Sequence, residues 1–155
     1  MNDLMIDIET LGTAPGSVIL SIGAIEFDAN TGDYGREFYV SIDPQSCIDV
    51  GMTMDFSTIK WWMDQSEKAR SEAFSGIVNV SVALDLLSDF VKSVGADRVW
   101  AKPPSFDHIL TEAAYRICKK EIPWHYKTPR DLRTLLDLTG VSQTYFGVAH
   151  NAGKV

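Results

Sequence analysis

The sequence has few cysteines, and they are poorly placed for either a disulfide framework or a zinc site. Cys47 and Cys118 are the 2 cysteines of the 155-residue chain. They lie far apart, and neither belongs to a Cys-x-x-Cys pair or has a histidine at the spacing of a zinc ligand. We therefore expect two reduced thiols and a fold held by its core, without cross-links.

Long apolar runs are also missing. No stretch approaches the ~18 residues of a membrane span, and the N-terminus lacks the pattern of a signal peptide. We therefore expect a cytoplasmic protein with no membrane partner. Repeats, low-complexity tracts and linkers are absent too, so a chain of 155 residues that is 45% hydrophobic predicts one domain over residues 1–155.

Basic residues are in the minority. The chain has 14 Lys and Arg against 21 Asp and Glu, a formal charge of −7. An acidic protein repels polyphosphate, which argues against non-specific binding to duplex nucleic acid. Local binding stays open, because divalent cations can neutralise a group of carboxylates.

The remaining pattern predicts an α/β domain. Strands are expected at residues 4–8, 17–27 and 36–42, and the turn sequence NTGDYG predicts a hairpin between the last two. One or two helices over 54–74 then precede helices over 81–95, 105–118 and 128–138, with a short strand at 98–101. This order favours a mixed sheet with three leading antiparallel strands, flanked by helices.

Residue types at the helix ends give finer predictions. Ser105 is expected to cap the helix over 105–118, and Thr128 to cap the last helix, with Pro129 at its first position. Val82 and Leu86 are expected on the apolar face of the helix over 81–95.

Two carboxylates interrupt the apolar start of the chain, LMIDIETLGT. Side chains of a strand alternate, so Asp7 and Glu9 point to the same face with their α-carbons about 6.6 Å apart. Two ionised groups on a half-buried strand repel each other and lose hydration, and a divalent cation removes both penalties. Oxygen ligands favour Mg²⁺, Mn²⁺ or Ca²⁺ over zinc. The alternative is a solvated face, or carboxylates that cap neighbouring groups.

Asp107 and His150 are ambiguous when taken alone. Asp107 opens a predicted helix, where the helix dipole favours an acid whatever its function. His150, in VAHNA, could equally be structural or exposed. His108 is a rival candidate base, one residue further along the helix and less well directed toward the carboxylates.

The ordered set of these segments resembles the DEDDh family of 3′→5′ exonucleases, which includes ribonuclease T, oligoribonuclease and the proofreading subunits of DNA polymerases. DIETLGT is similar to the first motif, SIGAIEFD to the strand that usually follows, WAKPPSFD to the second motif and VAHNA to the start of the third. TIKWWMDQSEKAR and PRDLRTLLDL look closest to a bacterial and phage exoribonuclease-like branch.

The resemblance implies a ribonuclease-H-like fold and a two-metal mechanism with Mg²⁺ or Mn²⁺. Asp7, Glu9 and Asp107 would be the metal ligands, and His150 would take the proton from the attacking water. The substrate would be the 3′ end of single-stranded RNA or DNA. Its terminal nucleotide would contact the segment from Thr10 to Gly12, with Leu11 wedged against the base; Trp62 and Phe106 complete the expected substrate-binding residues.

Stacking on a base is expected from Trp61 or Trp62, and Trp62 is the one taken as a substrate-binding residue. The alternative places one of these rings in the core and leaves the other partly exposed on the helix surface.

The chain departs from the family pattern at its end. The third motif has an aspartate five residues after the histidine, and that position is Val155. We therefore expect a chain shortened within the third motif, by nature or by cutting, that lacks the final helix. Loss of the fourth acidic ligand predicts impaired activity, and the uncovered apolar surface, with the segment TIKWWM, predicts a homodimer.

Three functions remain open on sequence alone. The first is a metal-dependent 3′→5′ exonuclease. The second is a catalytically inactive nucleic-acid-binding or interaction protein on the same fold, favoured by Val155. The third is a ribonuclease-H-like endonuclease or transposase relative, against which His150 argues.

Overall fold

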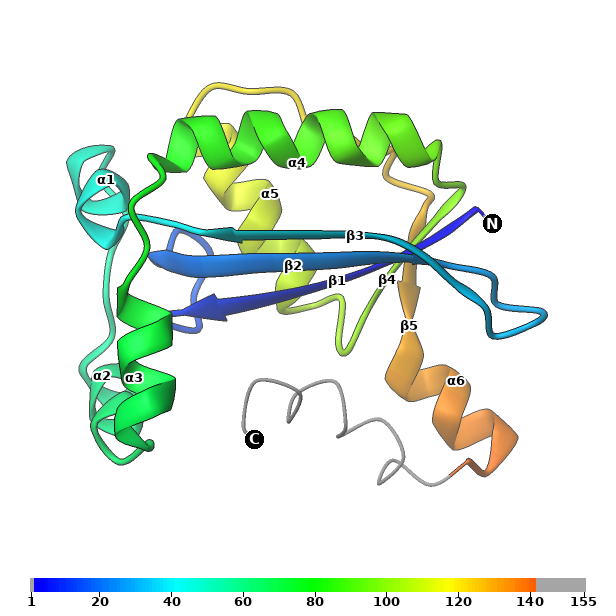
Figure 1. Ribbon diagram of the computed structural model, residues 1–155, viewed down its shortest axis with the longest axis horizontal. Coiled ribbons are helices and arrows are strands. Elements are labelled where there is room, and N and C mark those ends of the chain that lie inside the picture. The colour runs from blue at the N-terminus through cyan, green and yellow to red at the C-terminus, as the bar shows by residue number, and fades with distance from the viewer. Residues whose placement is uncertain (1, 142–155) are drawn as a thin grey trace.

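A computed structural model describes residues 2–141 and forms a five-stranded mixed sheet in the order β3-β2-β1-β4-β5 (Figure 1). The strands are β1 (Asp3–Thr10), β2 (Ile19–Phe27), β3 (Tyr34–Ser41), β4 (Arg98–Ala101) and β5 (Pro129–Asp131). β1, β2 and β3 are antiparallel neighbours, and β4 and β5 are parallel to β1. The predicted α/β fold with three leading antiparallel strands is confirmed.

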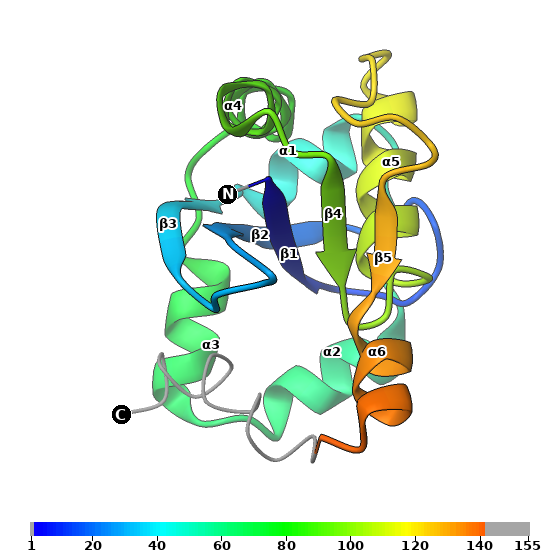
Figure 2. The ribbon, with the colours of Figure 1, turned by 90° about the vertical axis from the view of Figure 1, so that its right-hand side faces the viewer.

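Six helices in the described part of the chain flank this sheet. They are α1 (Pro44–Asp49), α2 (Phe56–Met63), α3 (Glu67–Phe74), α4 (Val80–Val94), α5 (Asp107–Ile117) and α6 (Leu132–Thr139). Figures 1 and 2 show α1, α4 and α5 on one side of the sheet and α2, α3 and α6 on the other. None of the helices between residues 2 and 141 is long and apolar enough to cross a membrane.

The main core lies between the sheet and the side that carries α4 and α5. Leu4, Ile6 and Ile8 of β1 are buried there, and so are Leu84 and Leu87 of α4. The Asn79 side chain caps α4 at its start, and Gly95 ends the helix in the left-handed conformation with φ 63°. Burial of these aliphatic side chains is the main stabilising contribution of such a layered fold.

The face of α4 is turned slightly from the predicted one. Val82 and Leu86 are 50% and 45% exposed, so the prediction that they face the core is wrong. The core side is lined by Val80, Ala83, Leu84, Leu87, Val91 and Val94. A helix of mostly apolar residues offers more than one such stripe, and packing against the sheet selects between them.

The last described helix begins later than its sequence predicts. Pro129 belongs to β5, where it pairs with Val99 of β4, and Asp131 caps α6 through its side chain. Proline is tolerated in β5 because this strand is the edge of the sheet. Ser105 likewise does not cap α5: the N-cap residue is Phe106, with no side-chain capping hydrogen bond. The predicted absence of a final helix concerns residues outside the described ones.

Candidate active site

The strand β1 separates an apolar face from a carboxylate face. Leu4, Ile6 and Ile8 point into the core, whereas Asp7 is exposed and Glu9 is half-buried on the opposite face. The prediction that both carboxylates share one face is confirmed, and they lie on the face turned away from the main core. Their partners on β2 are Gly23 and Ser21. Because these residues are small, little side-chain volume stands beside the two carboxylates on this face.

Asp107 reaches β1 between these two carboxylates. It is the first residue of α5 and is 3% exposed. Its Oδ1 accepts a hydrogen bond of 3.2 Å from the backbone N–H of Ile8. β4 pairs with β1 only from Asp3 to Met5, so the carboxylate binds the strand edge where that pairing has stopped. A contact across 99 residues of sequence therefore sets Asp107 against the backbone that links Asp7 to Glu9.

The surroundings of Asp107 oppose its ionisation. Burial is the main cause and the negative charge of Asp7 adds to it; together they raise the pKa of Asp107 to about 7, although the hydrogen bond from Ile8 acts in the opposite direction. A divalent cation near Asp7 and Asp107 would remove both causes, because it replaces lost hydration and screens the repulsion.

The donor chemistry of this site fits a hard divalent cation, but a complete ligand group is not assembled. Carboxylate oxygens are the ligands that Mg²⁺ and Mn²⁺ favour, and Asp7 and Asp107 are close enough to interact electrostatically. Between residues 2 and 141, however, no group of three or more His, Cys, Asp or Glu side chains is arranged to hold a metal ion. Glu9 belongs to the same strand face without completing such a group.

The loop after β1 is built by its own residues. The Thr10 hydroxyl donates to the Gly12 carbonyl at 2.7 Å. Leu11 is 3% exposed within the core, and its backbone bonds to Val18 and Asp55. A Cβ on Gly12 would lie 2.5 Å from Ser17 Oγ, so a larger residue there would force the Ser17 side chain to move. The burial of Leu11 favours a packing role and leaves little of its side chain to wedge against a base.

The two tryptophans of α2 have different surroundings. Trp62 is 6% exposed and donates from Nε1 to the Thr10 carbonyl at 2.9 Å. Trp61 is 51% exposed, with its ring centroid 5.0 Å from that of Trp62 in an edge-on arrangement. The structure therefore matches the alternative of one core ring and one exposed ring, and the ring available for stacking is that of Trp61.

Phe106 and His108 flank Asp107 and pack inward. Phe106 is partly buried against the core. His108 is 2% exposed, its ring meets Trp124 edge-on at 5.5 Å, and burial lowers its pKa. Neither His108 ring nitrogen has a hydrogen-bond partner in the described structure. His108 therefore faces the core and not the carboxylates. His150 and Val155 lie outside the described residues.

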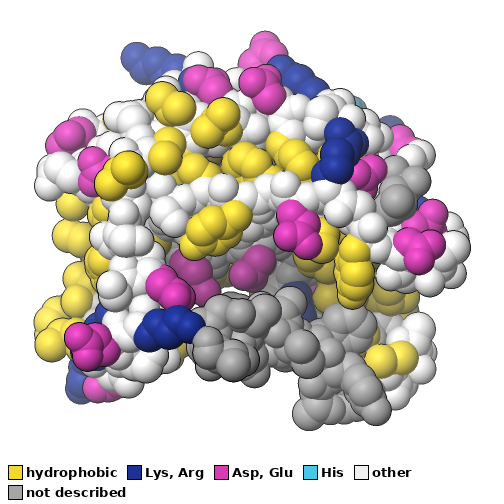
Figure 3. Space-filling model, in the orientation of Figure 1, with side chains coloured by type: hydrophobic (Ala, Val, Ile, Leu, Met, Phe, Trp, Pro, Cys, Tyr) yellow, Lys and Arg dark blue, Asp and Glu magenta, His cyan; other side chains and the backbone are white. Residues whose placement is uncertain are grey.

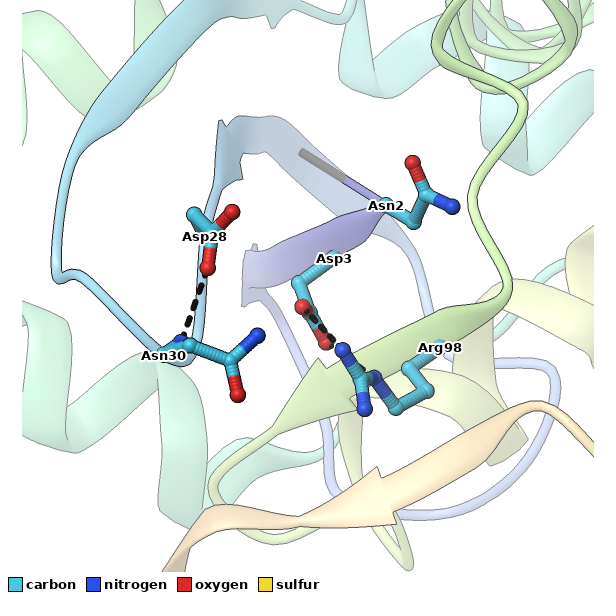
Figure 4. Close-up of a pocket in the computed structure, with 5 residues that line it drawn as sticks. All are labelled: Asn2, Asp3, Asp28, Asn30 and Arg98. Carbon is cyan, nitrogen blue, oxygen red and sulfur yellow. Dashed lines mark hydrogen bonds and ion pairs between the residues drawn. The ribbon is translucent and has the colours of Figure 1, made fainter.

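The opposite end of β1 holds a polar pocket of about 210 Å³ that sequence reasoning missed (Figure 4). Asp3 there accepts hydrogen bonds from Arg98 at 2.6 and 2.7 Å and from Trp100 at 2.7 Å. Burial alone would raise the pKa of Asp3, but these bonds and one from Ala29 outweigh it and lower the pKa. This satisfied cluster ties β1 to β4, which is a structural role.

The chain is similar to one known protein family and to solved structures of an exonuclease. The 3′-5′ exoribonuclease Rv2179c-like domain matches residues 2–154. Escherichia coli exonuclease I in complex with a dT13 oligonucleotide is similar with a TM-score of 0.68 and 15% identity, over 92% of this chain and 30% of that chain. Apo exonuclease I gives a TM-score of 0.64 and 16% identity, over 88% and 29%.

These similarities to solved structures concern the fold, since the identities are low. They agree with the ribonuclease-H-like arrangement of the sheet. The chain spans less than a third of the length of these exonuclease I chains. Curated protein sequences give no match.

Proposed function

This chain belongs to the Rv2179c-like family of 3′-5′ exoribonuclease domains, and we propose that it is a metal-dependent 3′→5′ exonuclease of single-stranded nucleic acid. The observation that carries the proposal is the Asp107 carboxylate bound to the Ile8 amide, beside Asp7 on the carboxylate face of β1. A pKa raised by burial and by a neighbouring carboxylate is typical of a functional site.

In this proposal Asp7, Glu9 and Asp107 would hold Mg²⁺ or Mn²⁺. When bound, two such ions would stabilise the attacking and leaving oxygens of an in-line displacement at phosphorus. Hydrogen bonds within the chain hold the proposed ligand Asp107 and the helix α2 in place. The Ile8 amide fixes one oxygen of Asp107, and the bond from Trp62 to Thr10 holds α2 against the end of β1. His150 is the proposed general base.

The proposed substrate is a single-stranded 3′ end. The family description favours RNA, whereas the exonuclease I complex contains a DNA oligonucleotide, so both need testing. The acidic chain would repel duplex phosphates. The exposed ring of Trp61 lies on α2, which contacts the loop after β1, and it could stack on an unpaired base of any sequence.

A non-catalytic nucleic-acid-binding protein is the second candidate. It is favoured by one observation, that the described carboxylates do not form a complete metal-ligand group. On this alternative the carboxylate face of the sheet binds single strands without hydrolysis.

We also propose that the protein forms a homodimer. The support is the exposure of Phe56, Trp61 and Met63 on α2, at 76%, 51% and 66%. Large apolar side chains gathered on one helix are typical of a protein interface.

The test of the enzymatic proposal uses 5′-labelled single-stranded RNA and DNA of the same sequence, with Mg²⁺, Mn²⁺ or EDTA. We expect stepwise shortening from the 3′ end that requires the metal. Asp7→Asn and Asp107→Asn should each reduce the rate by at least about a hundredfold, because metal binding contributes several kcal/mol.

Asp89→Asn is the matched control, because Asp89 is an exposed acid on α4, on the other side of the sheet. It should retain full activity. Binding of both oligonucleotides without any shortening would support the non-catalytic alternative and contradict the enzymatic proposal.

A further inference from the structure

The carboxylate face of β1 continues across the sheet as a cross-strand row that starts at Asp7. Asp7 pairs with Gly23 on β2, and Gly23 pairs with Tyr39 on β3. Residues directly opposite each other in antiparallel strands point to the same face. Tyr39 therefore shares the face of Asp7. The next row is Glu9, Ser21 and Ser41. In both rows a small residue of β2 therefore separates the carboxylate of β1 from the residue of β3.

Gly23 leaves the middle of this row without a side chain. A Cβ placed on it would lie 3.9 Å from Tyr39 Cδ2 and 3.9 Å from the Asp7 carbonyl oxygen. The tyrosine ring therefore borders the space above the glycine. Glycine inside a strand weakens the sheet, and it often marks a place where a ligand approaches the backbone.

The same face contains a cavity. It has a volume of about 430 Å³ and is lined by Tyr39, Ser41, Glu72 and Ser75, so that β3 supplies one wall and the end of α3 the other. This volume lies in the range of small-molecule sites, about 300–1,000 Å³. Figure 3 shows acidic side chains gathered in a hollow on the side of the sheet where α2 and α3 lie.

Tyr39 is largely exposed on the edge strand β3. It is 66% exposed, and its hydroxyl lies 3.4 Å from Ser41 Oγ. The nearby acidic residues on this face are Glu37 and Glu72, and Glu72 is paired with Lys68 at 4.0 Å. An exposed aromatic ring can stack on an uncharged base whatever the sequence of the nucleic acid.

We propose that Tyr39 is a substrate-positioning residue whose ring stacks on the base of the penultimate nucleotide, seated over Gly23. The inference rests on the proposed function, because Asp7 fixes where the reacting phosphate lies. Adjacent strands are about 4.8 Å apart, so Tyr39 lies two strands, or about 10 Å, from Asp7. That separation suits the nucleotide next to the one removed. The continuity of this face with the carboxylates favours a nucleic-acid strand over a second copy of the chain.

The test measures equilibrium binding of a labelled single-stranded oligonucleotide, in EDTA and in Ca²⁺, by fluorescence anisotropy. Tyr39→Ala should weaken binding about 5- to 100-fold, and Tyr39→Phe less than about 2-fold, because the phenyl ring keeps the stacking face. Tyr34→Ala is the matched control, since Tyr34 is on the same strand and is 75% exposed. It should bind like the wild type.

A second oligonucleotide, abasic at the penultimate position, separates stacking from packing. On it, Tyr39→Ala and the wild type should bind equally, whereas an abasic position several nucleotides upstream should preserve their difference. If the ring only covers Gly23, as aromatic residues do for strand glycines, Tyr39→Ala would lose the same factor on both oligonucleotides, and the inference would be wrong.

Gly23→Val gives an independent variant. Valine favours a strand, so the protein should unfold at a higher temperature, yet its side chain would fill the proposed base site and weaken binding. Wild-type binding by Gly23→Val or Tyr39→Ala in a protein that shortens oligonucleotides overturns this inference alone. A wild type that neither binds nor shortens them overturns the proposed function as well.

Discussion

At the scale of single residues, Asp107 is a buried carboxyl that accepts a hydrogen bond from the Ile8 N–H. An uncharged amide oxygen at the same place could accept that bond too. The pKa of Asp107 is raised to about 7 in the folded protein. Stability from such a group is fully present below the unfolded pKa of about 3.9 and is lost as the pH rises through about 7. Ionised Asp107 therefore destabilises the metal-free protein at pH 8.

Asp107→Asn should consequently stabilise the metal-free protein in alkaline solution. The amide oxygen can still accept from Ile8 N–H, and no charge is buried. We expect the free energy of unfolding to rise by about 1–3 kcal/mol at pH 8, below the limit set by about 1.4 kcal/mol per pKa unit, and to rise by less at pH 5, which lies closer to the unfolded pKa. Urea denaturation in EDTA at both pH values measures this.

Asp3 provides the opposite case and serves as the control. Its pKa is lowered, so its contribution is present at neutral pH and is lost as the pH falls. Asp3→Asn should therefore destabilise the protein at pH 8. Equal losses for both variants at pH 8 would contradict the account of Asp107.

The two tryptophans of α2 should differ sharply when each is truncated. Trp62→Ala removes a buried ring and its bond to Thr10, so we expect a loss of about 3–5 kcal/mol. Trp61→Ala removes a half-exposed ring and should cost about 1 kcal/mol or less. Urea titrations compare the two variants, and similar losses would show that the assignment of core and surface rings is wrong.

At this scale the sequence predicts the properties of a residue that depend only on its neighbours along the chain. The period of a strand places Asp7 and Glu9 on one face without any tertiary information. It could not decide the fate of Leu11 or Trp62, because their burial depends on contacts with Val18, Asp55 and the end of β1. The position of Asp107 beside Ile8 likewise arises from packing across the whole sheet.

At the scale of elements, the start of α6 is set by β5. Asp131 Oδ1 accepts from Arg133 N–H at 2.9 Å, and Oδ2 accepts from the Thr134 hydroxyl at 2.8 Å. Asp131→Ala should lower the free energy of unfolding by about 0.5–2 kcal/mol, as for other N-caps. Thr128→Ala should cost less, because Thr128 lies before the strand and caps no helix in the described structure. Urea denaturation ranks the two, and the reverse order would support the predicted cap at Thr128.

The length of an element decides whether the sequence predicts it, and this explains why the start of α6 was predicted too early. Alternating or apolar runs fixed β1, β2 and β3, and helical periodicity fixed α4 and α5, since each of these is long enough to show its period. β5 has three residues and exists because Val99 pairs with Pro129. Without that pairing, Thr-Pro followed by an apolar periodic run is a good helix start.

At the scale of the whole molecule, the exposed side chains of α2 compete with the net charge of −7. A stable dimer buries about 800 Å² on each partner, more than one short helix offers, so the interface must extend beyond Phe56, Trp61 and Met63. Charge repulsion between copies is screened by salt. We therefore expect a concentration-dependent homodimer that strengthens as ionic strength rises, because apolar burial drives it and like charges oppose it.

Light scattering after size exclusion, at micromolar concentrations and at two salt concentrations, measures this association. The double variant Phe56→Glu with Met63→Glu places two charges on exposed positions of α2, so it should remain folded and shift the mass to that of a monomer. Tyr126→Glu is the matched control, because Tyr126 is 76% exposed in a different segment, and it should leave the dimer intact. A wild-type mass of 17.2 kDa at every concentration and salt would contradict the homodimer. It would leave the face of α2 free for the single-stranded substrate, and Trp61→Ala would then weaken oligonucleotide binding without changing the mass.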